Sequence, residues 1–330
     1  MQILYPFVSF TDNGIKFFGY YMVSVSVLMP VFNVEEYISE TLDSILSQSS
    51  IDFELVIIDD ASTDNTVSVV DRYRSIDSRI KFIKNERNLG ISGALNKGLA
   101  VCTGEYIARV DGDDLMSPER LIKQYDFLEK NRDHALVGCW VKNINVNGDI
   151  IAECKYPCDH AAITSMLQWT SPVLHIWMAR KSVYDSLGGY RNTNPAEDYD
   201  FLLRCIAKGL KVANIPFYGA FIRLRQGNTL SVASLKQRKA FNYLYSLYKL
   251  GAINNSNHMD LNEVDELKVT YLMNRIHLLS SKFLSAGFER RNSYKKYVYF
   301  FLSLISPYTI QDIYRRLMFK RALRKYRGEE

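Results

Sequence analysis

The sequence predicts an α/β fold built on a Rossmann-like, mostly parallel sheet, with an antiparallel extension and a C-terminal helical region. Short apolar runs alternate with amphipathic segments from Val23 to Lys130, strand-like segments dominate from there to residue 234, and only helical periodicity follows. Strands that alternate with helices favour a parallel sheet covered on both faces. The 330 residues, 47% of them hydrophobic, can bury one large core and a smaller appendage.

The first strand and the helix after it carry clear local signals. Residues 23–29 form an apolar strand that is expected to stop at Pro30, because proline donates no hydrogen bond to a ladder. Asn33 is expected to cap the next helix, with Glu36 as its capping-box partner. Further strands are predicted at residues 53–58, 80–83 and 106–110, each followed by a helix.

The pattern changes after Lys130. Residues 135–146 and 212–222 are strand-like, and Asn147-Gly148 is a hairpin turn signal. A helix is expected to open at Glu197, and we expect the strands of this half to extend the sheet in antiparallel fashion. The predicted division is an N-terminal extension at 1–22, a main domain at 23–234 with halves at 23–130 and 131–234, and a C-terminal helical region at 235–330.

The composition argues against several classes of protein. A formal net charge of +5 is too small for a dedicated nucleic-acid binder, so no nucleic acid is expected as a partner. Five cysteines are an odd and low number for this length, which favours a reducing compartment over a disulfide framework. Cys154, Cys158 and His160 offer too few ligands for a closed zinc site. No segment reaches the roughly 18–20 apolar residues that cross a bilayer.

The residues before the first strand look unlike the rest. They are apolar only in patches and lack the basic start of a signal peptide. Met22 stands directly before the strand, so we expect the preceding segment to be either a flexible extension or an over-called start.

Carboxylates gather at the predicted ends of two parallel strands. Asp59-Asp60 follows the second strand, and Asp111-Gly112-Asp113-Asp114 follows the fourth. Ligands of open parallel sheets bind beyond these ends, so the carboxylates would converge on one crevice. They would repel one another unless a cation lay among them, and Mg²⁺ or Mn²⁺ with a diphosphate is the natural partner. One aspartate after a strand is usually a turn or a cap, but this pair of clusters is rare. Gly112 also lets the backbone come close to a ligand.

Several stretches of the first half belong to a recognisable pattern. They are Val25 to Asn33, Leu42 to Gln48, Glu54 to Asp64, Asn88-Leu89-Gly90, Asn96-Lys97-Gly98, Gly104 to Ile107 and Asp111 to Asp114. Together they resemble the family 2 nucleotide-sugar glycosyltransferases, which are inverting enzymes with the GT-A fold. The resemblance is nearly continuous from Val25 to Leu121, and a weaker match continues through Leu187 to Tyr190 and Glu197-Asp198 to Arg204.

The resemblance implies a divalent cation, Mn²⁺ or Mg²⁺, and a donor site for a nucleotide-diphosphate sugar, with a UDP-sugar favoured. Phe32 would stack on the nucleobase, although it could instead pack as a hydrophobic staple for the following helix. Asp60 would hold the base, Asp111 the ribose or the sugar, and Asp113 the cation that bridges the diphosphate. The other donor-site positions are Pro30, Val31, Asn33, Glu35, Asn88 and Gly112.

Asp198 is the candidate catalytic base. Inverting transfer is an in-line displacement, and the acceptor hydroxyl must lose its proton as it attacks. Glu197 and Asp198 open a predicted helix, whose dipole favours an ionised carboxylate. Both could also be plain capping residues of the first turn, but the motifs upstream favour Asp198 as the base.

Other positions depart from the family pattern or extend it. Many relatives carry a basic residue where this chain has Leu95, so one contact to the sugar or phosphate is missing or supplied elsewhere. Arg223 and Arg225 could reach the diphosphate or belong to a solvated face. His175 matches a histidine that relatives often carry near the acceptor, but a lone histidine among apolar residues is more often structural.

Residues 294–310 are rich in aromatic and aliphatic side chains and are flanked by basic residues. Such a segment suits docking on an anionic membrane leaflet, or packing on the main domain or on a second copy. We therefore expect a cytoplasmic enzyme, free or peripheral on the inner face of the membrane. It would transfer a single sugar to a saccharide or lipid-linked acceptor, since the Gln-X-X-Arg-Trp of polymerising relatives is absent. A nucleotidyltransferase on a similar sheet and a non-catalytic scaffold are the alternatives, and the oligomeric state is open.

Overall fold

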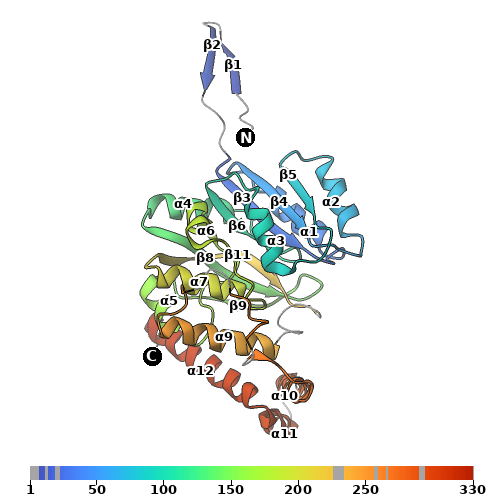
Figure 1. The fold of residues 1–330 in the computed structure, drawn as a ribbon, viewed down its shortest axis with the longest axis vertical. Coiled ribbons are helices and arrows are strands. Elements are labelled where there is room, and N and C mark those ends of the chain that lie inside the picture. Colours follow the sequence, from blue (N-terminus) through green and yellow to red (C-terminus); the bar gives the residue numbers. More distant parts are fainter. Residues whose placement is uncertain are drawn as a thin grey trace.

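The computed structural model describes residues 7–11, 14–18, 23–225, 234–255, 259–264, 267–289 and 294–329. In these residues a nine-stranded mixed sheet with helices on both faces forms the main body, and helices α9 to α12 lie together at one end of it (Figure 1). The predicted α/β class with C-terminal helices is therefore confirmed.

The strands of the first half form the parallel part of the sheet. In spatial order they are β5 (Ile80–Lys84), β4 (Phe53–Asp59), β3 (Val25–Val31) and β6 (Tyr106–Arg109). Alternate residues of β4 belong to two separate hydrophobic clusters, with Val56 and Ile58 in one and Leu55 and Ile57 in the other. Both faces are buried because helices cover them, as is typical of parallel sheets. These helices are α1 (Ile38–Leu46), α2 (Thr66–Arg74) and α3 (Gly90–Leu99).

The second half extends the sheet in mixed directions rather than in antiparallel fashion throughout. β10 (Met178–Arg180) is antiparallel to both β6 and β8 (His134–Ile144), and β9 (Ile150–Cys154) returns antiparallel to β8 after the predicted turn. β11 (Lys211–Arg223), however, runs parallel to β8, because the connection between them crosses over through several helices. The remaining elements are β7 (Leu115–Met116), α4 (Arg120–Lys130), α5 (His160–Met166), α6 (Lys181–Leu187) and α7 (Glu197–Ala207).

The end of β3 differs from the prediction. Pro30 and Val31 lie inside the strand rather than after it, paired with Ile58 and Asp59 of β4. β6 pairs with β3 only as far as Leu28, so Pro30 has a single neighbouring strand. A missing N–H is tolerated at such a position.

The predicted capping box is wrong. α1 begins at Ile38 after Tyr37, and no side chain caps it. Asn33 instead adopts a φ of 51°, and its Oδ1 accepts a hydrogen bond from the Thr63 N–H at 2.8 Å. It therefore joins the loop after β3 to the loop after β4, a tertiary contact that local capping patterns cannot reveal.

A buried ion network fixes the position of α7. The carboxylate of Asp200 is fully buried and pairs with both Arg191 and Arg204. Arg191 also donates to the carbonyl of Ile253 at 2.9 Å, and Arg204 donates to the carbonyl of Leu187 at 2.8 Å. One carboxylate thus ties α7 to segments on both sides of it in the sequence.

We expect Asp200→Asn to lower the free energy of unfolding by about 3–5 kcal/mol, because two buried guanidinium groups would lose their counter-charge. Asp185→Asn is the matched control, since Asp185 pairs with Lys181 on the surface and its side chain is 65% exposed. That change should cost less than about 1 kcal/mol. Denaturant titration of both variants measures the difference, and equal losses would contradict a special role for the network.

The C-terminal helices are α9 (Ser234–Lys249), α10 (Tyr271–Glu289), α11 (Lys295–Leu302) and α12 (Pro307–Arg327). α9 packs on α7, and α12 packs on the second half through ring contacts between Trp169 and Tyr314 and between Tyr156 and Phe319. None of the side chains of α11 is buried. The C-terminal region therefore packs on the second half through α12, while the side chains of α11 are not buried.

The two N-terminal strands do not belong to the main sheet. β1 (Phe7–Thr11) and β2 (Gly14–Phe18) form an antiparallel pair of their own, while the rest of the predicted extension at 1–22 lies outside the described residues. Among the described helices, none has the length and hydropathy that a membrane span requires.

Candidate active site

A cavity of about 440 Å³ at the carboxyl end of β6 is lined by residues from distant parts of the chain, and we call it the Asp198 cavity. Asp111 enters it after β6, His175 enters it before β10, and Glu197 and Asp198 enter it from the start of α7. The structure therefore brings together Asp111 and Asp198, the predicted sugar-binding residue and the predicted base.

Arg109, the last residue of β6, connects these two groups. Its Nε lies 3.2 Å from Asp111 Oδ1, and its Nη2 lies 3.1 Å from Glu197 Oε1. Burial alone would lower the pKa of Arg109, but the charges of Asp111 and Glu197 raise it well above its ordinary value. A permanent cation therefore sits between the carboxylate after β6 and the carboxylates that open α7.

Asp198 is partly exposed in the first turn of α7. Its Oδ1 accepts a hydrogen bond from the N–H of Tyr199 at 2.7 Å. The dipole of α7 stabilises a carboxylate at this end of the helix. Asp198 thus has the access and the electrostatic setting of a base that takes a proton from a ligand in the cavity.

His175 and Asp114 form a second charged group beside Asp111. The Nε2 of His175 lies 3.4 Å from Asp111 Oδ2 and 3.6 Å from Asp114 Oδ2. Burial alone would lower the pKa of His175, but the two carboxylates raise it to about 9. Burial raises the pKa of Asp114 to about 6, although His175 opposes this, and the charges of Arg109 and His175 overcome burial to lower the pKa of Asp111.

This group has the composition of a metal site. The ligand atoms of Asp111, Asp114 and His175 all lie within 4.8 Å of one another, and no other such group occurs in the described part of the chain. Two carboxylates and an imidazole are donors that Mn²⁺ accepts. The Nε2 of His175 is buried and contacts the two carboxylates at ion-pair distances, without a hydrogen bond to a described residue. With a pKa of about 9 this nitrogen carries a proton at neutral pH, and it would have to lose that proton to hold a cation.

Asp113, the predicted metal ligand, points to a different partner. Its Oδ2 accepts a hydrogen bond from Arg225 Nε at 2.6 Å. Asp113 lies next to Asp114 in the loop after β6, so a cation there would be close to the group of three. Its role as a metal ligand stays a prediction.

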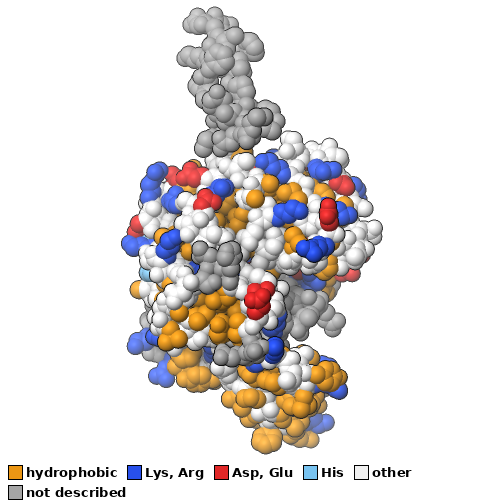
Figure 2. Space-filling model, viewed as in Figure 1, with side chains coloured by type: hydrophobic (Ala, Val, Ile, Leu, Met, Phe, Trp, Pro, Cys, Tyr) orange, Lys and Arg blue, Asp and Glu red, His pale blue; other side chains and the backbone are white. Residues whose placement is uncertain are grey.

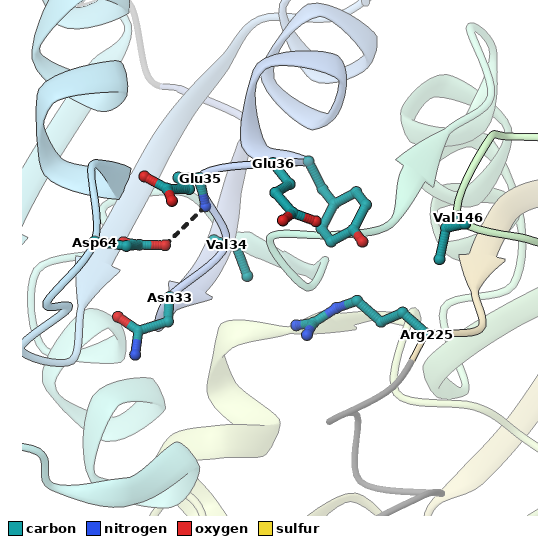
Figure 3. A pocket seen from close by; sticks show the side chains of 8 residues that line it. Asn33, Val34, Glu35, Glu36, Asp64, Val146 and Arg225 are labelled. Atoms are coloured by element: carbon teal, nitrogen blue, oxygen red, sulfur yellow. Dashed lines mark hydrogen bonds between the residues drawn. The ribbon is translucent and has the colours of Figure 1, made fainter.

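Asn33 and Glu35 line a separate cavity of about 450 Å³, the Asn33 cavity, together with Asp64 and Arg225. Figure 3 shows the guanidinium of Arg225 pointing into this cavity toward Asn33. The N–H of Glu35 donates to Asp64 Oδ2 at 3.0 Å, and Glu35 Oε2 accepts from the N–H of Asn65 at 2.7 Å. These bonds hold the loop after β3, which carries the predicted donor-site residues Asn33 and Glu35, against the loop after β4.

The other predicted donor-site residues shape the same edge of the sheet. Phe32 directly follows β3 and is 45% exposed, so part of its ring surface is accessible to a ligand. Asp60 is buried, and its Oδ1 accepts bonds from Asn85 Nδ2 and from the N–H of Leu89, each at 2.8 Å. Asn88 is exposed and accepts a bond from the N–H two residues later at 3.0 Å. Their contacts with a nucleotide stay predictions.

Gly112 is required for a contact within the protein. A Cβ at this position would lie 2.7 Å from Val31 Cγ1 and 3.2 Å from Val34 Cγ2. Its carbonyl accepts a bond from Thr41 Oγ1 at 3.1 Å. The close approach of this glycine is therefore to β3 and α1, and it sets the position of the aspartates on either side.

Arg223, a candidate for contact with the diphosphate, and Leu95, which departs from the family pattern, both pack inside the protein. Arg223 is buried, and it donates to the carbonyls of Asp113 at 3.0 Å and Val146 at 2.9 Å, so it supports the aspartate loop and does not belong to a solvated face. Leu95 is fully buried in the core under β3 and β4.

Sequence reasoning missed several residues of the Asp198 cavity. A charged residue inside the apolar run Tyr106–Val110 was a signal for Arg109, and Asp114 belonged to a recognised motif. Nothing local pointed to the arginines that line the cavity from α9 and α12, because only the docking of these helices brings them there. They are Arg238, Arg315 and Arg316.

The comparisons with known proteins agree with this geometry. The model of the family described as "Glycosyl transferase family 2" matches residues 26–188. The O-antigen biosynthesis glycosyltransferase WbnJ of Escherichia coli is 36% identical over 184 residues, which are 55% of this chain and 71% of that protein.

Two solved structures share the fold. TarS 1–349 of S. aureus, in complex with UDP-GlcNAc, has a TM-score of 0.57 at 20% identity, and the match covers 92% of each chain. The mannosyltransferase PcManGT of Pyrobaculum calidifontis, in complex with GDP-Man and Mn²⁺, has a TM-score of 0.58 at 18% identity, with 90% of this chain and 88% of that chain covered. The chain therefore belongs to glycosyl transferase family 2 and is a nucleotide-sugar glycosyltransferase with the GT-A fold.

Proposed function

We propose that this enzyme transfers a single sugar, with inversion, from a nucleotide-diphosphate donor to a hydroxyl of a saccharide or lipid-linked acceptor. One observation carries the proposal: Asp111 and Asp198 line one cavity and are joined through Arg109 and Glu197. An in-line displacement needs the donor sugar and the base to be held on the two sides of the same cavity, and these two carboxylates meet that requirement.

Asp198 acts as the base in this proposal. As the acceptor oxygen forms its bond to the anomeric carbon, the bond from that carbon to the diphosphate oxygen breaks, and the acceptor proton moves to the Asp198 carboxylate. Burial raises the pKa of the neighbouring Glu197, but Glu197 is buried and paired with Arg109, whereas Asp198 is partly exposed to the cavity. The nucleoside diphosphate leaves on the opposite face of the sugar.

The donor side uses the loops after β3, β4 and β6. Phe32 would stack on the base and Asp60 would hold it. Asp113 would hold the cation, with Asp111, Asp114 and His175 as the neighbouring donors. A bound Mn²⁺ or Mg²⁺ would stabilise the negative charge of the leaving diphosphate. A UDP-sugar is the favoured donor, and the UDP-GlcNAc and GDP-Man bound by the two structural relatives support a nucleotide diphosphate without selecting the base.

A panel of UDP-, GDP- and dTDP-sugars with Mn²⁺ tests this proposal. We expect one nucleotide to stabilise the protein by about 2.7 kcal/mol at a hundred times its Kd, because it binds only the folded state. Differential scanning fluorimetry finds the donor, and product analysis should then show release of a nucleoside diphosphate.

Two results would contradict the proposed function. Release of pyrophosphate would indicate a nucleotidyltransferase, and the absence of stabilisation by every nucleotide would remove the donor site altogether. ADP with Mn²⁺ serves as a control for nonspecific effects of nucleotide and metal.

We also propose that this enzyme touches an anionic membrane through the α10–α11 surface. Figure 2 shows hydrophobic side chains gathered over these helices at the lower end of the molecule. Lysines at the start of α11 complement anionic headgroups, and aromatic rings suit the headgroup region. The exposed large apolar residues of the α10–α11 surface are Tyr271, Leu272, Ile276, Leu279, Tyr294, Tyr297, Val298 and Phe301.

Phe301→Ser should weaken binding to vesicles that contain phosphatidylglycerol by about tenfold, because a ring that is 75% exposed in the free protein would otherwise be buried in lipid. Ile76→Ser is the control, since Ile76 is 82% exposed but lies after α2. Vesicle sedimentation measures both. If the protein is a dimer that Phe301→Ser dissociates and it does not bind vesicles, the surface joins two copies instead.

A further inference from the structure

The far wall of the Asp198 cavity is made by the C-terminal helices. Arg238 of α9 and Arg315 and Arg316 of α12 line the cavity together with the rings of Trp169 and Phe319. The three arginines lie outside the residues matched by the family model, which end at 188. The two ends of the cavity therefore differ in chemistry: carboxylates surround Arg109 at the sheet, and three guanidinium groups surround Asp312 at the helices.

The arginines are only partly satisfied by the protein. Arg315 is 8% exposed. Among the described residues, its guanidinium makes one hydrogen bond, in which Nη2 donates to Asn242 Oδ1 at 2.7 Å. Its Nη1 and the Nε of Arg238 are buried without a partner in the described part of the chain. Asp312 pairs with Arg238. Among the described residues that line this end of the cavity, it is the one carboxylate beside the three arginines. Burial and the charge of Arg238 lower the pKa of Arg315 to about 10, which leaves it charged at neutral pH.

Buried guanidinium groups with unused donors are costly unless a ligand completes them. Phosphate oxygens are the acceptors that match their planar geometry best. We infer that this wall, the arginine wall of Arg238, Arg315 and Arg316, binds a phosphate group carried by the acceptor. The inference rests on the proposed function, since it specifies the acceptor of that reaction.

The position of the wall fits a phosphate attached close to the attacked sugar. Tyr199, the neighbour of Asp198, stacks on Phe241 with ring centroids 4.0 Å apart. The guanidinium of Arg315 lies 4.4 Å from the centroid of the same ring. The arginine wall is therefore joined to α7 through Phe241 and Tyr199, and Asp198 and Arg315 line the same cavity. A sugar phosphate in this cavity would place its hydroxyl at Asp198 and its phosphate at Arg315.

Isothermal titration of the full chain tests the inference without requiring turnover. The donor site is first saturated with the nucleotide found in the panel and Mg²⁺, and the probes are glucose 1-phosphate, inorganic phosphate, geranyl phosphate and methyl glucoside. We expect glucose 1-phosphate to bind at least tenfold more tightly than methyl glucoside. Arg315→Gln should remove this tenfold advantage, because the loss of a charge-assisted hydrogen bond to phosphate lowers affinity by about tenfold or more.

Two further variants guard against loss of structure. Arg316→Gln changes an exposed residue of the wall and should weaken glucose 1-phosphate about fivefold with an unchanged melting temperature. Arg324→Gln makes the same change elsewhere on α12 and should have no effect.

The outcomes separate the claims. Tighter binding of geranyl phosphate than of inorganic phosphate would identify a lipid-linked acceptor, and equal binding would identify a phosphate on a soluble saccharide; both support the arginine wall. Equal affinities of the wild type, Arg315→Gln and Arg316→Gln for every phosphate probe would overturn it. Failure of every nucleotide in the panel would instead overturn the proposed function, and the phosphate titrations can be repeated without nucleotide.

Discussion

Asp198→Asn should lower the turnover number for sugar transfer by about a thousandfold, while the affinity for the donor stays within about twofold. Positioned general bases contribute roughly a hundredfold to ten-thousandfold, and asparagine cannot accept the proton. The substitution keeps the size of the side chain and leaves the Arg109–Glu197 pair in place. Steady-state kinetics with the donor identified by the panel measures the loss, and titration calorimetry measures donor binding.

Asp185→Asn is the control for this experiment, because Asp185 pairs with Lys181 on the surface of α6 and does not line the Asp198 cavity. Its turnover should match the wild type. If Asp198→Asn kept more than a tenth of the activity, Asp198 would be a capping residue of α7 and another group would take the proton.

Asp113→Ala should reduce metal-dependent transfer by about a thousandfold. A cation that neutralises a leaving diphosphate contributes several kcal/mol, and each 1.36 kcal/mol is a factor of ten in rate. The variant should also bind Mn²⁺ more weakly in the presence of nucleotide, which electron paramagnetic resonance detects independently of turnover. Removal of metal from the wild type with EDTA should have the same effect on activity, and added Mn²⁺ should restore it.

His175→Gln distinguishes two arrangements of the metal site. If Asp113 is the main ligand, His175→Gln should weaken Mn²⁺ binding much less than Asp113→Ala does. If the reverse holds, the group of Asp111, Asp114 and His175 is the primary site, and the assignment to Asp113 is wrong. Asp126→Asn, an exposed change on α4, should alter neither measurement.

Much of the donor half could be predicted because its signals are local. The alternation of apolar runs with amphipathic segments located β3, β4, β5 and β6, and parallel strands necessarily bring their carboxyl ends to one edge. The aspartates after β4 and β6 could therefore be placed at the same edge of the sheet, and Asp111 is the one of them that lines the Asp198 cavity. Their convergence on one crevice stays a prediction. The direction of β11 was harder to predict, because a strand pattern does not record which neighbour it pairs with.

Local rules failed where a tertiary contact competed with them. Asn33 has the sequence context of a helix cap, yet its side chain binds the Thr63 N–H, because two loops meet at the sheet edge. Gly112 could be recognised from the sequence as a site of close approach. Only the structure shows that the side chains of Val31 and Val34 are the groups that lie against it.

The sequence alone determined the family, the parallel half of the sheet and the carboxylates of its edge, since each depends on periodicity or on motifs within a few residues. Only the tertiary structure decided that Arg109 joins Asp111 to the start of α7, that His175 lies between Asp111 and Asp114, and that Arg315 faces the cavity of Asp198. These meetings depend on how β10, α7 and α12 pack against the sheet, and packing is set by the whole hydrophobic core and not by the residues nearby in the chain.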